Sequence, residues 1–463
     1  MKKFGLAKYV VPSIIAMVLV GTYTNIDGLF IGNRAGDDGL AAINVAWPIV
    51  AFITSLGTAL GMGASVEINN FRGQGQNRLA EKIKNTALLV LFAAGALATA
   101  FCLAVYSPLL KLLGASGDVM TYAKNYALVI SLGSVFQVVG AGVVVLLRND
   151  GKTFLSAAYT AVGLAVHVGL DFVLVNKYAL YGVAASTVVS QAVVAALGLF
   201  SFIKNKKIIA VLDATENSEK IDDISEKFAE NNKNVIINKD KKFPCLKSVI
   251  KNSFAPLGLN FAPSAALTFT NIFALKEGGV AAVSAYAVMS YVLYTYDYVY
   301  QGVCDGVQPL LSYYEGAGDR LNSAKTVRSS CILLAVFSVV FAALTPAAIA
   351  FLPGIFSVSA EAEAMMKVGF IIYAFAYPLK AAVKFSCAYF YSTGKTAYAN
   401  FIAYADPLLF TPLFLLLSLV TGINGVWAAL TLSQAATCVL AVILLMVYKR
   451  YKTKKSAYKS VNE

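Results

Sequence analysis

Residues 22–48 read TYTNIDGLFIGNRAGDDGLAAINVAWP, and they place one carboxylate, Asp27, inside the first long apolar segment of the chain. That segment, from about residue 9 to residue 32, is long enough to cross a lipid bilayer. Beyond it the chain is interrupted by three glycines before the next apolar run starts near residue 44. An ionised side chain within a span costs several kcal/mol, so Asp27 is predicted to serve a function.

Composition defines the class of protein. The 463 residues are 58% hydrophobic and only 14% charged, with a mean hydropathy of +0.68, whereas soluble domains carry roughly 25% charged residues. The sequence therefore predicts a polytopic membrane protein that is embedded in the lipid bilayer. The net charge of +13 does not indicate nucleic-acid binding, because the basic residues lie between apolar runs and at the end of the chain. The first segment is too long for a signal peptide and is expected to be retained.

The apolar runs predict an all-α integral membrane protein with twelve transmembrane helices. We expect an amino-terminal six-helix bundle (1–203), a polar linker (204–251) with a short amphipathic helix near 221–228, a carboxy-terminal six-helix bundle (252–448) and a basic tail (449–463). The expected spans are 9–32, 44–70, 86–108, 124–147, 154–176, 182–203, 252–275, 280–311, 328–351, 365–390, 398–420 and 425–448.

The distribution of basic residues predicts the orientation. With both termini inside, 30 of the 38 Lys and Arg residues fall in inner loops, the linker and the tail. Such a bias favours cytoplasmic termini. We therefore expect a multi-pass protein with the linker and the tail at the inner face of the membrane.

An internal repeat relates the two bundles. Gly-Gln-Gly at residues 73–75 recurs as Gly-Ala-Gly at 316–318, Gly-Lys-Thr at 151–153 recurs at 394–396, and Ser-Gln at 190–191 recurs at 433–434, each 243 residues later. Because each half has an even number of spans, the halves should share one orientation and face each other across a central cavity. Alternating access is the usual activity of that architecture.

Enzymatic motifs are weak in this chain, and we expect no enzyme. The two Gly-Lys-Thr sequences lack the glycine that a phosphate-binding loop needs five residues earlier. Tyr296-Asp297 followed by Gly316-Ala317-Gly318-Asp319 is similar to the motif pair of intramembrane aspartyl proteases, but the glycines belong to the repeated turn. A single histidine leaves no room for a histidine-rich metal site, and six scattered cysteines predict neither zinc nor disulfides.

Several stretches resemble the multidrug and toxic compound extrusion (MATE) family, in particular its DinF-like and MepA-like bacterial branch. They are DGLFIG and LAAINVAWP (27–48), GMGASVEINNFRGQGQ (61–76), LDFVLV (170–175) and GVQPLLSYYEGAGD (306–319). The resemblance implies efflux of organic, often cationic, small molecules in exchange for protons or Na⁺. It also implies a bacterial inner membrane, a coupling ion in place of any cofactor, and a monomer. Asp27 and Asp171 match the two carboxylates that bind the coupling ion in this family.

Physical reasoning favours the same pair. Spans one and five both start inside, so Asp27 and Asp171 lie at depths where they could meet. Two carboxylates that share a low-dielectric pocket cannot both stay ionised cheaply, and a proton or Na⁺ is suited to such a pair. The pair is thus also the candidate metal site if sodium is the coupling ion. Asn25, Asn44 and Thr187 are candidate neutral ligands, although ordinary interhelical hydrogen bonds would explain them equally well.

One departure from the family pattern concerns the coupling ion. His167 stands four residues before Asp171, where family members commonly carry asparagine, and this spacing puts both on one helix face. An imidazole there favours proton coupling over sodium coupling. A neutral histidine that only hydrogen-bonds between helices is the alternative.

A second departure lies in the carboxy-terminal bundle, where span ten carries Lys380 and Lys384. Each lone ammonium would be costly there, so we predict that both pair with some of Asp297, Asp305 and Asp406 beside a water-filled cavity. A lipid-linked-precursor flippase is the alternative function, because it would need a cationic cavity. Acidic cavity walls would favour organic cations instead, and a passive channel is less favoured because no ring of filter residues is visible.

Overall fold

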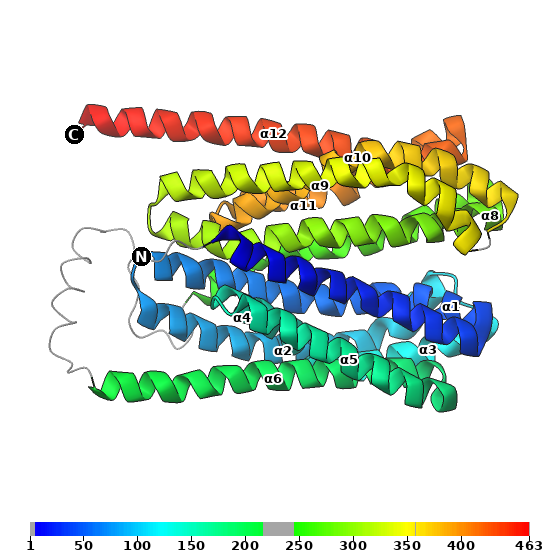
Figure 1. Cartoon of the computed structure of the whole chain (residues 1–463), viewed down its shortest axis with the longest axis horizontal. Helices are drawn as coiled ribbons and strands as arrows, with labels where there is room; N and C mark the ends of the chain where they lie inside the picture. Colours follow the sequence, from blue (N-terminus) through cyan, green and yellow to red (C-terminus); the bar gives the residue numbers. More distant parts are fainter. Residues whose placement is uncertain (1–4, 216–244, 357, 463) are drawn as a thin grey trace.

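The computed structural model describes residues 5–215, 245–356 and 358–462, with the side chains at 24, 25, 29, 32, 33, 37, 204–215, 449 and 451–462 left out. Its regular secondary structure consists of helices alone in these ranges (Figure 1). The helices are α1 (Leu6–Gly73), α2 (Asn77–Leu112), α3 (Gly117–Leu132), α4 (Ser134–Asn149), α5 (Thr153–Tyr178), α6 (Leu180–Thr215), α8 (Leu246–Gly316), α9 (Arg320–Ile355), α10 (Ala360–Ser392), α11 (Thr396–Thr421) and α12 (Ile423–Asn462).

The two longest helices each contain two of the predicted spans. α1 breaks at Gly36 (φ 58°, ψ −148°), and α8 breaks at Gly279 (φ 62°, ψ −156°). Residues that carry a Cβ rarely adopt this backbone conformation. Glycine is therefore favoured at the two positions where the chain turns back. The breaks separate the spans predicted at 9–32 and 44–70, and those predicted at 252–275 and 280–311.

The prediction of twelve spans is confirmed. Ten stretches of the described helices are long and apolar enough to cross a membrane, with α8 counted once. Dividing α8 at Gly279 adds one span, and α3 with α4, bent by 60°, adds another. The bend falls at Gly133, where a Cβ would collide with Val188 of α6. Close packing against α6 thus requires glycine at a kink that the sequence analysis did not predict.

Several helix ends differ from the predicted edges. α6 continues to Thr215 and α8 already starts at Leu246, so residues 246–251, assigned above to the linker, are helical. α12 likewise continues through the basic tail as far as Asn462. Hydropathy marks where the apolar run stops, but a helix can continue into water through charged residues, which are good helix formers. The short helix predicted at 221–228 lies outside the described residues.

The internal repeat is visible in the backbone. α2 and α9 both have 36 residues, and α5 and α11 both have 26, with starting residues 243 positions apart in each case. The left-handed turn residues repeat with the same offset, as Gly36 and Gly279, Gly75 and Gly318, Gly151 and Gly394, and Ala179 and Gly422. The chain therefore folds as two equivalent lobes, the N-lobe (α1–α6) and the C-lobe (α8–α12), seen one above the other in Figure 1.

The lobes approach most closely at one end of the bundle. We call the end where α1 begins, at Leu6, the terminal end, and the opposite end, with the breaks at Gly36 and Gly279, the far end. A Cβ on Gly316 would collide with the carbonyl of Asn70, and a Cβ on Gly306 would lie 2.6 Å from Val10 Cα. These contacts join α1 to α8, so in this conformation the lobes are packed backbone to backbone at the terminal end.

Candidate functional site

Three ionisable side chains meet inside the N-lobe. His167 Nε2 lies 2.7 Å from Asp27 Oδ1 and 3.2 Å from Asp171 Oδ2. Asp27 comes from the first half of α1, whereas His167 and Asp171 stand one turn apart on α5. All three are buried, and their ligand atoms lie within 4.8 Å of one another. The structure therefore brings together the two acids and the histidine that the sequence singled out.

The hydrogen bonding of this cluster is incomplete. Neither oxygen of Asp171 has a hydrogen-bond partner among the described residues, and neither does His167 Nδ1. Ser186 of α6 lies beside Asp171, but its hydroxyl donates to Gly182 O at 3.0 Å. The ring of Tyr23 covers the imidazole, with centroids 5.0 Å apart. A buried carboxylate whose closest polar contact is an imidazole nitrogen 3.2 Å away is costly, which is the property expected of a group that takes up a proton or cation.

The structure gives no contact between the neutral ligand candidates and this cluster among the described residues. Asn44 is exposed, and the hydroxyl of Thr187 donates to Val183 O at 3.0 Å within α6. The side chain of Asn25 lies outside the described part of the chain. Two carboxylates and an imidazole nitrogen are a poor set for a hard cation, because such ions prefer several oxygen ligands. A proton needs no such shell, so the donor set suits it better.

The equivalent place in the C-lobe is apolar. Residues 243 positions after His167 and Asp171 are Phe410 and Phe414 of α11, both with no exposed surface. Phe414 stacks on Phe273 of α8 with ring centroids 5.3 Å apart. The repeated scaffold thus holds an ionisable cluster in one lobe and an aromatic cluster in the other.

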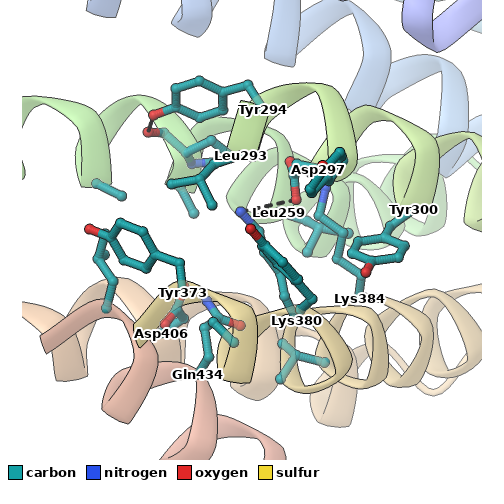
Figure 2. A pocket seen from close by; sticks show the side chains of 18 of the residues that line it. Leu259, Leu293, Tyr294, Asp297, Tyr300, Tyr373, Lys380, Lys384, Asp406 and Gln434 are labelled. Atoms are coloured by element: carbon teal, nitrogen blue, oxygen red, sulfur yellow. Dashed lines mark hydrogen bonds and ion pairs between the residues drawn. The ribbon is translucent and has the colours of Figure 1, made fainter. Parts of the chain in front are cut away.

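A second polar region lines a cavity of about 90 Å³ inside the C-lobe. Lys384 Nζ lies 2.8 Å from Asp297 Oδ2, and Lys380 Nζ lies 3.1 Å from Asp297 Oδ1 (Figure 2). Gln301 adds an amide oxygen 3.0 Å from Lys384 Nζ. Lys380 and Lys384 of α10 therefore contact one aspartate of α8.

The other two acids have different partners. Asp406 of α11 accepts hydrogen bonds from Ser433 and, at 2.7 Å, from Gln434 Nε2, both on α12. Asp305 lies 3.0 Å from Arg148 Nη2 of the N-lobe. Among the described residues, no ion pair joins either acid to a lysine of α10. The prediction left open which of the three acids pair with the lysines, and the structure pairs both lysines with Asp297, whereas Asp305 faces the other lobe and Asp406 faces α12.

Sequence reasoning missed Arg148, which it had counted among the residues of an inner loop. Arg148 ends an apolar run on α4, and its side chain is only 3% exposed. Its partner Asp305 is 1% exposed and also accepts from Gln301 Nε2 at 2.7 Å. The available signal was Asp305 itself, because an acid within an apolar span requires a cation from some neighbour.

Aromatic side chains dominate the rest of the cavity wall. Six tyrosines contribute to it, together with aliphatic residues from α8, α10, α11 and α12. The tyrosines are Tyr286, Tyr294, Tyr296, Tyr300, Tyr373 and Tyr377. Two aspartates and two lysines line the same space, so neither sign of charge prevails on the wall.

Two repeated six-helix lobes, with buried ionisable groups in one and a charged, tyrosine-lined cavity in the other, define a membrane transporter that works between two lobes. The sequence profile of the MatE family matches residues 12–173 and 256–415. The chain belongs to this family, the MATE multidrug efflux transporters.

Named relatives agree with that membership. The multidrug export protein MepA of Staphylococcus aureus is 22% identical over 305 residues, which cover 65% of this chain and 62% of MepA. The fold matches that of the MATE multidrug transporter DinF-BH, solved in complex with a ligand, with a TM-score of 0.77, 22% identity, and 95% and 94% of the two chains covered.

A third protein with the same fold is described by the polarity of its binding pocket. It is a MOP-superfamily transporter from Pyrococcus furiosus, with a TM-score of 0.81 at 16% identity over 95% of this chain and 94% of that one. Its binding pocket is described as having reversed polarity, which suggests a different function for that protein. The fold alone therefore does not specify what this chain carries.

Proposed function

We propose that this protein is a proton-coupled antiporter that exports organic compounds, with Asp27, His167 and Asp171 as its coupling site. The observation that carries the proposal is the position of His167 Nε2 within reach of both carboxylates, deep in the N-lobe. An imidazole between two acids can hold a proton in several arrangements, which suits a site that loads and releases one.

A change in the net charge of this cluster is the proposed link between proton binding and substrate transport. With both acids ionised and the imidazole protonated, the cluster carries one net negative charge in a buried site. One further proton neutralises it and removes the cost of burying that charge. In the proposed cycle, proton uptake from the far end and proton release at the terminal end accompany opposite openings of the two lobes.

The proposed orientation places the terminal end in the cytoplasm of a bacterium and the far end outside. Its support is the concentration of Lys and Arg in the loops and tail at the terminal end. In this orientation the packed contacts of α1 with α8 close the cytoplasmic side. The coupling site lies nearer the far end, since Asp27 stands nine residues before the break at Gly36.

The cavity favours an organic substrate with an aromatic or aliphatic body, because tyrosines and aliphatic side chains form most of its wall. The balanced charge of the wall gives no preference for organic cations. A flippase for lipid-linked precursors stays the second candidate, on the specific observation that Lys380 is 28% exposed beside the cavity.

Transport in proteoliposomes tests the proposal. A fluorescent organic compound is followed while a pH gradient or a Na⁺ gradient is imposed separately. We expect the pH gradient to drive export and His167→Asn to weaken it, whereas the control Asp118→Asn, which neutralises an exposed acid of α3, leaves export unchanged. Export driven by Na⁺ at constant pH and insensitive to a protonophore would overturn proton coupling.

A further inference from the structure

We propose that Lys380 binds the anionic group of the transported compound, a carboxylate or phosphate carried on an apolar body. This assigns a substrate class to the cavity and rests on the proposed transport function for its physiological meaning. The binding itself can be measured without any gradient.

The first argument is the ratio of charges around Asp297. Two ammonium groups, those of Lys380 and Lys384, lie within 3.1 Å of this one carboxylate. One carboxylate compensates one of them, so the group of three carries a net positive charge. The other acid of the cavity wall, Asp406, interacts with Lys380 electrostatically but forms no ion pair with either lysine among the described residues. Asp297 is buried, and an uncompensated charge in such a place is costly. An anion bound beside the lysines would remove this cost.

The second argument identifies Lys380 as the lysine with free hydrogen-bonding capacity. Lys384 is 6% exposed and donates to both Asp297 Oδ2 and Gln301 Oε1. Lys380 is 28% exposed, and its ion pair with Asp297 Oδ1, at 3.1 Å, engages one of its donors. An ammonium group offers three donors. In Figure 2 Lys380 extends from α10 across the cavity toward α8, so the donors that Asp297 does not engage are available to a ligand.

Other cavity groups also point to a ligand with polar atoms. The hydroxyl of Tyr373 and the amide oxygen of Gln434 are buried, line the cavity and have no hydrogen-bond partner among the described residues. Such groups usually have a partner in native proteins. The two oxygens of Asp406, by contrast, already accept from Ser433 and Gln434. The unused capacity of the wall therefore includes the donors of Lys380 and Tyr373, which suit an oxyanion.

The size of the cavity limits how the ligand binds. About 90 Å³ holds a small headgroup, whereas sites for drug-sized molecules measure roughly 300–1,000 Å³. The anionic group would lie on Lys380, and the apolar body would extend along the tyrosines as the wall opens. The alternative ligand, an organic cation, would have to approach Asp297 past two lysines.

The test uses the full-length protein in nanodiscs of zwitterionic lipid, with calorimetric titration. Two pairs of probes share an apolar body and differ in charge: 4-phenylbutyrate with 4-phenylbutylammonium, and dodecyl phosphate with dodecyltrimethylammonium. We expect at least one anion of the two pairs to bind, and Lys380→Met to weaken it by about tenfold to a hundredfold, the effect of one charge-assisted hydrogen bond. Lys380→Arg should retain binding.

The matched control is Lys367→Met, which removes an exposed lysine of the same helix and should leave affinity unchanged. Binding of 4-phenylbutyrate alone indicates a free organic acid, and binding of dodecyl phosphate alone indicates a lipid phosphate. Both results support the proposal.

The proposal is overturned if neither anion binds or if Lys380→Met binds them as tightly as the wild type. If the methionine variant is not monodisperse, Lys380→Gln replaces it. The wild-type comparison needs no variant: tighter binding of the ammonium probes than of the anions also overturns the proposal. A protein that binds anions but shows no gradient-driven export would refute antiport and leave this site intact.

Discussion

Removal of Arg148 should destabilise the closed contact between the lobes. Arg148 of α4 and Asp305 of α8 lie 3.0 Å apart with 3% and 1% of their side chains exposed, so Arg148→Met leaves a buried acid with Gln301 as its remaining partner. Breaking a buried pair on one side costs about 3–5 kcal/mol. Replacing both members by apolar residues, Arg148→Met with Asp305→Leu, should recover most of this loss, because no charge is then left buried.

Thermal unfolding of purified variants measures this effect. For 463 residues the unfolding entropy amounts to roughly 1 kcal/mol per degree, so each single variant should lose about 3–5 °C in Tm. The control Arg78→Met removes an exposed arginine at the start of α2 and should change Tm by less than about 1 °C. The double variant should lie closer to the wild type than either single variant does.

The order of the Tm values of the four variants shows whether the Arg148–Asp305 pair stabilises the closed contact. If both single changes shift Tm by less than the control does, the pair contributes nothing to the closed state. Additive losses in the double variant would also refute the reasoning, because residues that share one interaction must show a coupling energy.

Three further substitutions test the coupling site and the terminal end. Asp27→Asn and Asp171→Asn should each abolish gradient-driven export while the protein stays monodisperse, because neutralising a buried acid lowers its desolvation cost; export at the wild-type rate would remove that residue from the coupling site. Gly316→Ala should speed amide hydrogen exchange in the turns of the terminal end, because its Cβ would collide with the carbonyl of Asn70. Exchange no faster than in Gly354→Ala, whose new Cβ meets nothing within 4 Å, would contradict that.

The architecture was predictable because hydropathy and repetition are properties of the chain alone. The number of spans followed from the lengths of the apolar runs. The offset of 243 residues followed from short turn motifs such as those at Gly151 and Gly394, which the backbone shares as left-handed turns. The bend at Gly133 was not predictable, because the apolar run from 124 to 147 continues across that glycine without interruption.

The acids of the polar sites, His167 and the two cavity lysines were predictable from the sequence, whereas Arg148 and the pairing of the charges were not. An acid within a span requires a partner at a similar depth in the membrane. This requirement reduces the candidate partners of each acid to a few side chains. Depth says nothing about rotation of a helix about its own axis, and rotation turned Asp305 toward Arg148 and Asp406 toward Ser433. The spacing of His167 and Asp171 fixed their shared face on α5, whereas the contact of His167 with Asp27 needed the packing of α1 on α5.

The exchange of His167 and Asp171 for Phe410 and Phe414 in the equivalent helix carries an evolutionary consequence. Both α5 and α11 keep the same length, and each is followed at the far end by a residue with positive φ, Ala179 and Gly422. The ionisable cluster is therefore not what holds such a helix in place, since the aromatic copy builds the same backbone without it. After duplication each half was free to specialise while its twin preserved the scaffold. Each residue of a repeated helix thus has a reference position in the other half, so the chain itself records two side chains that the fold accepts at that position.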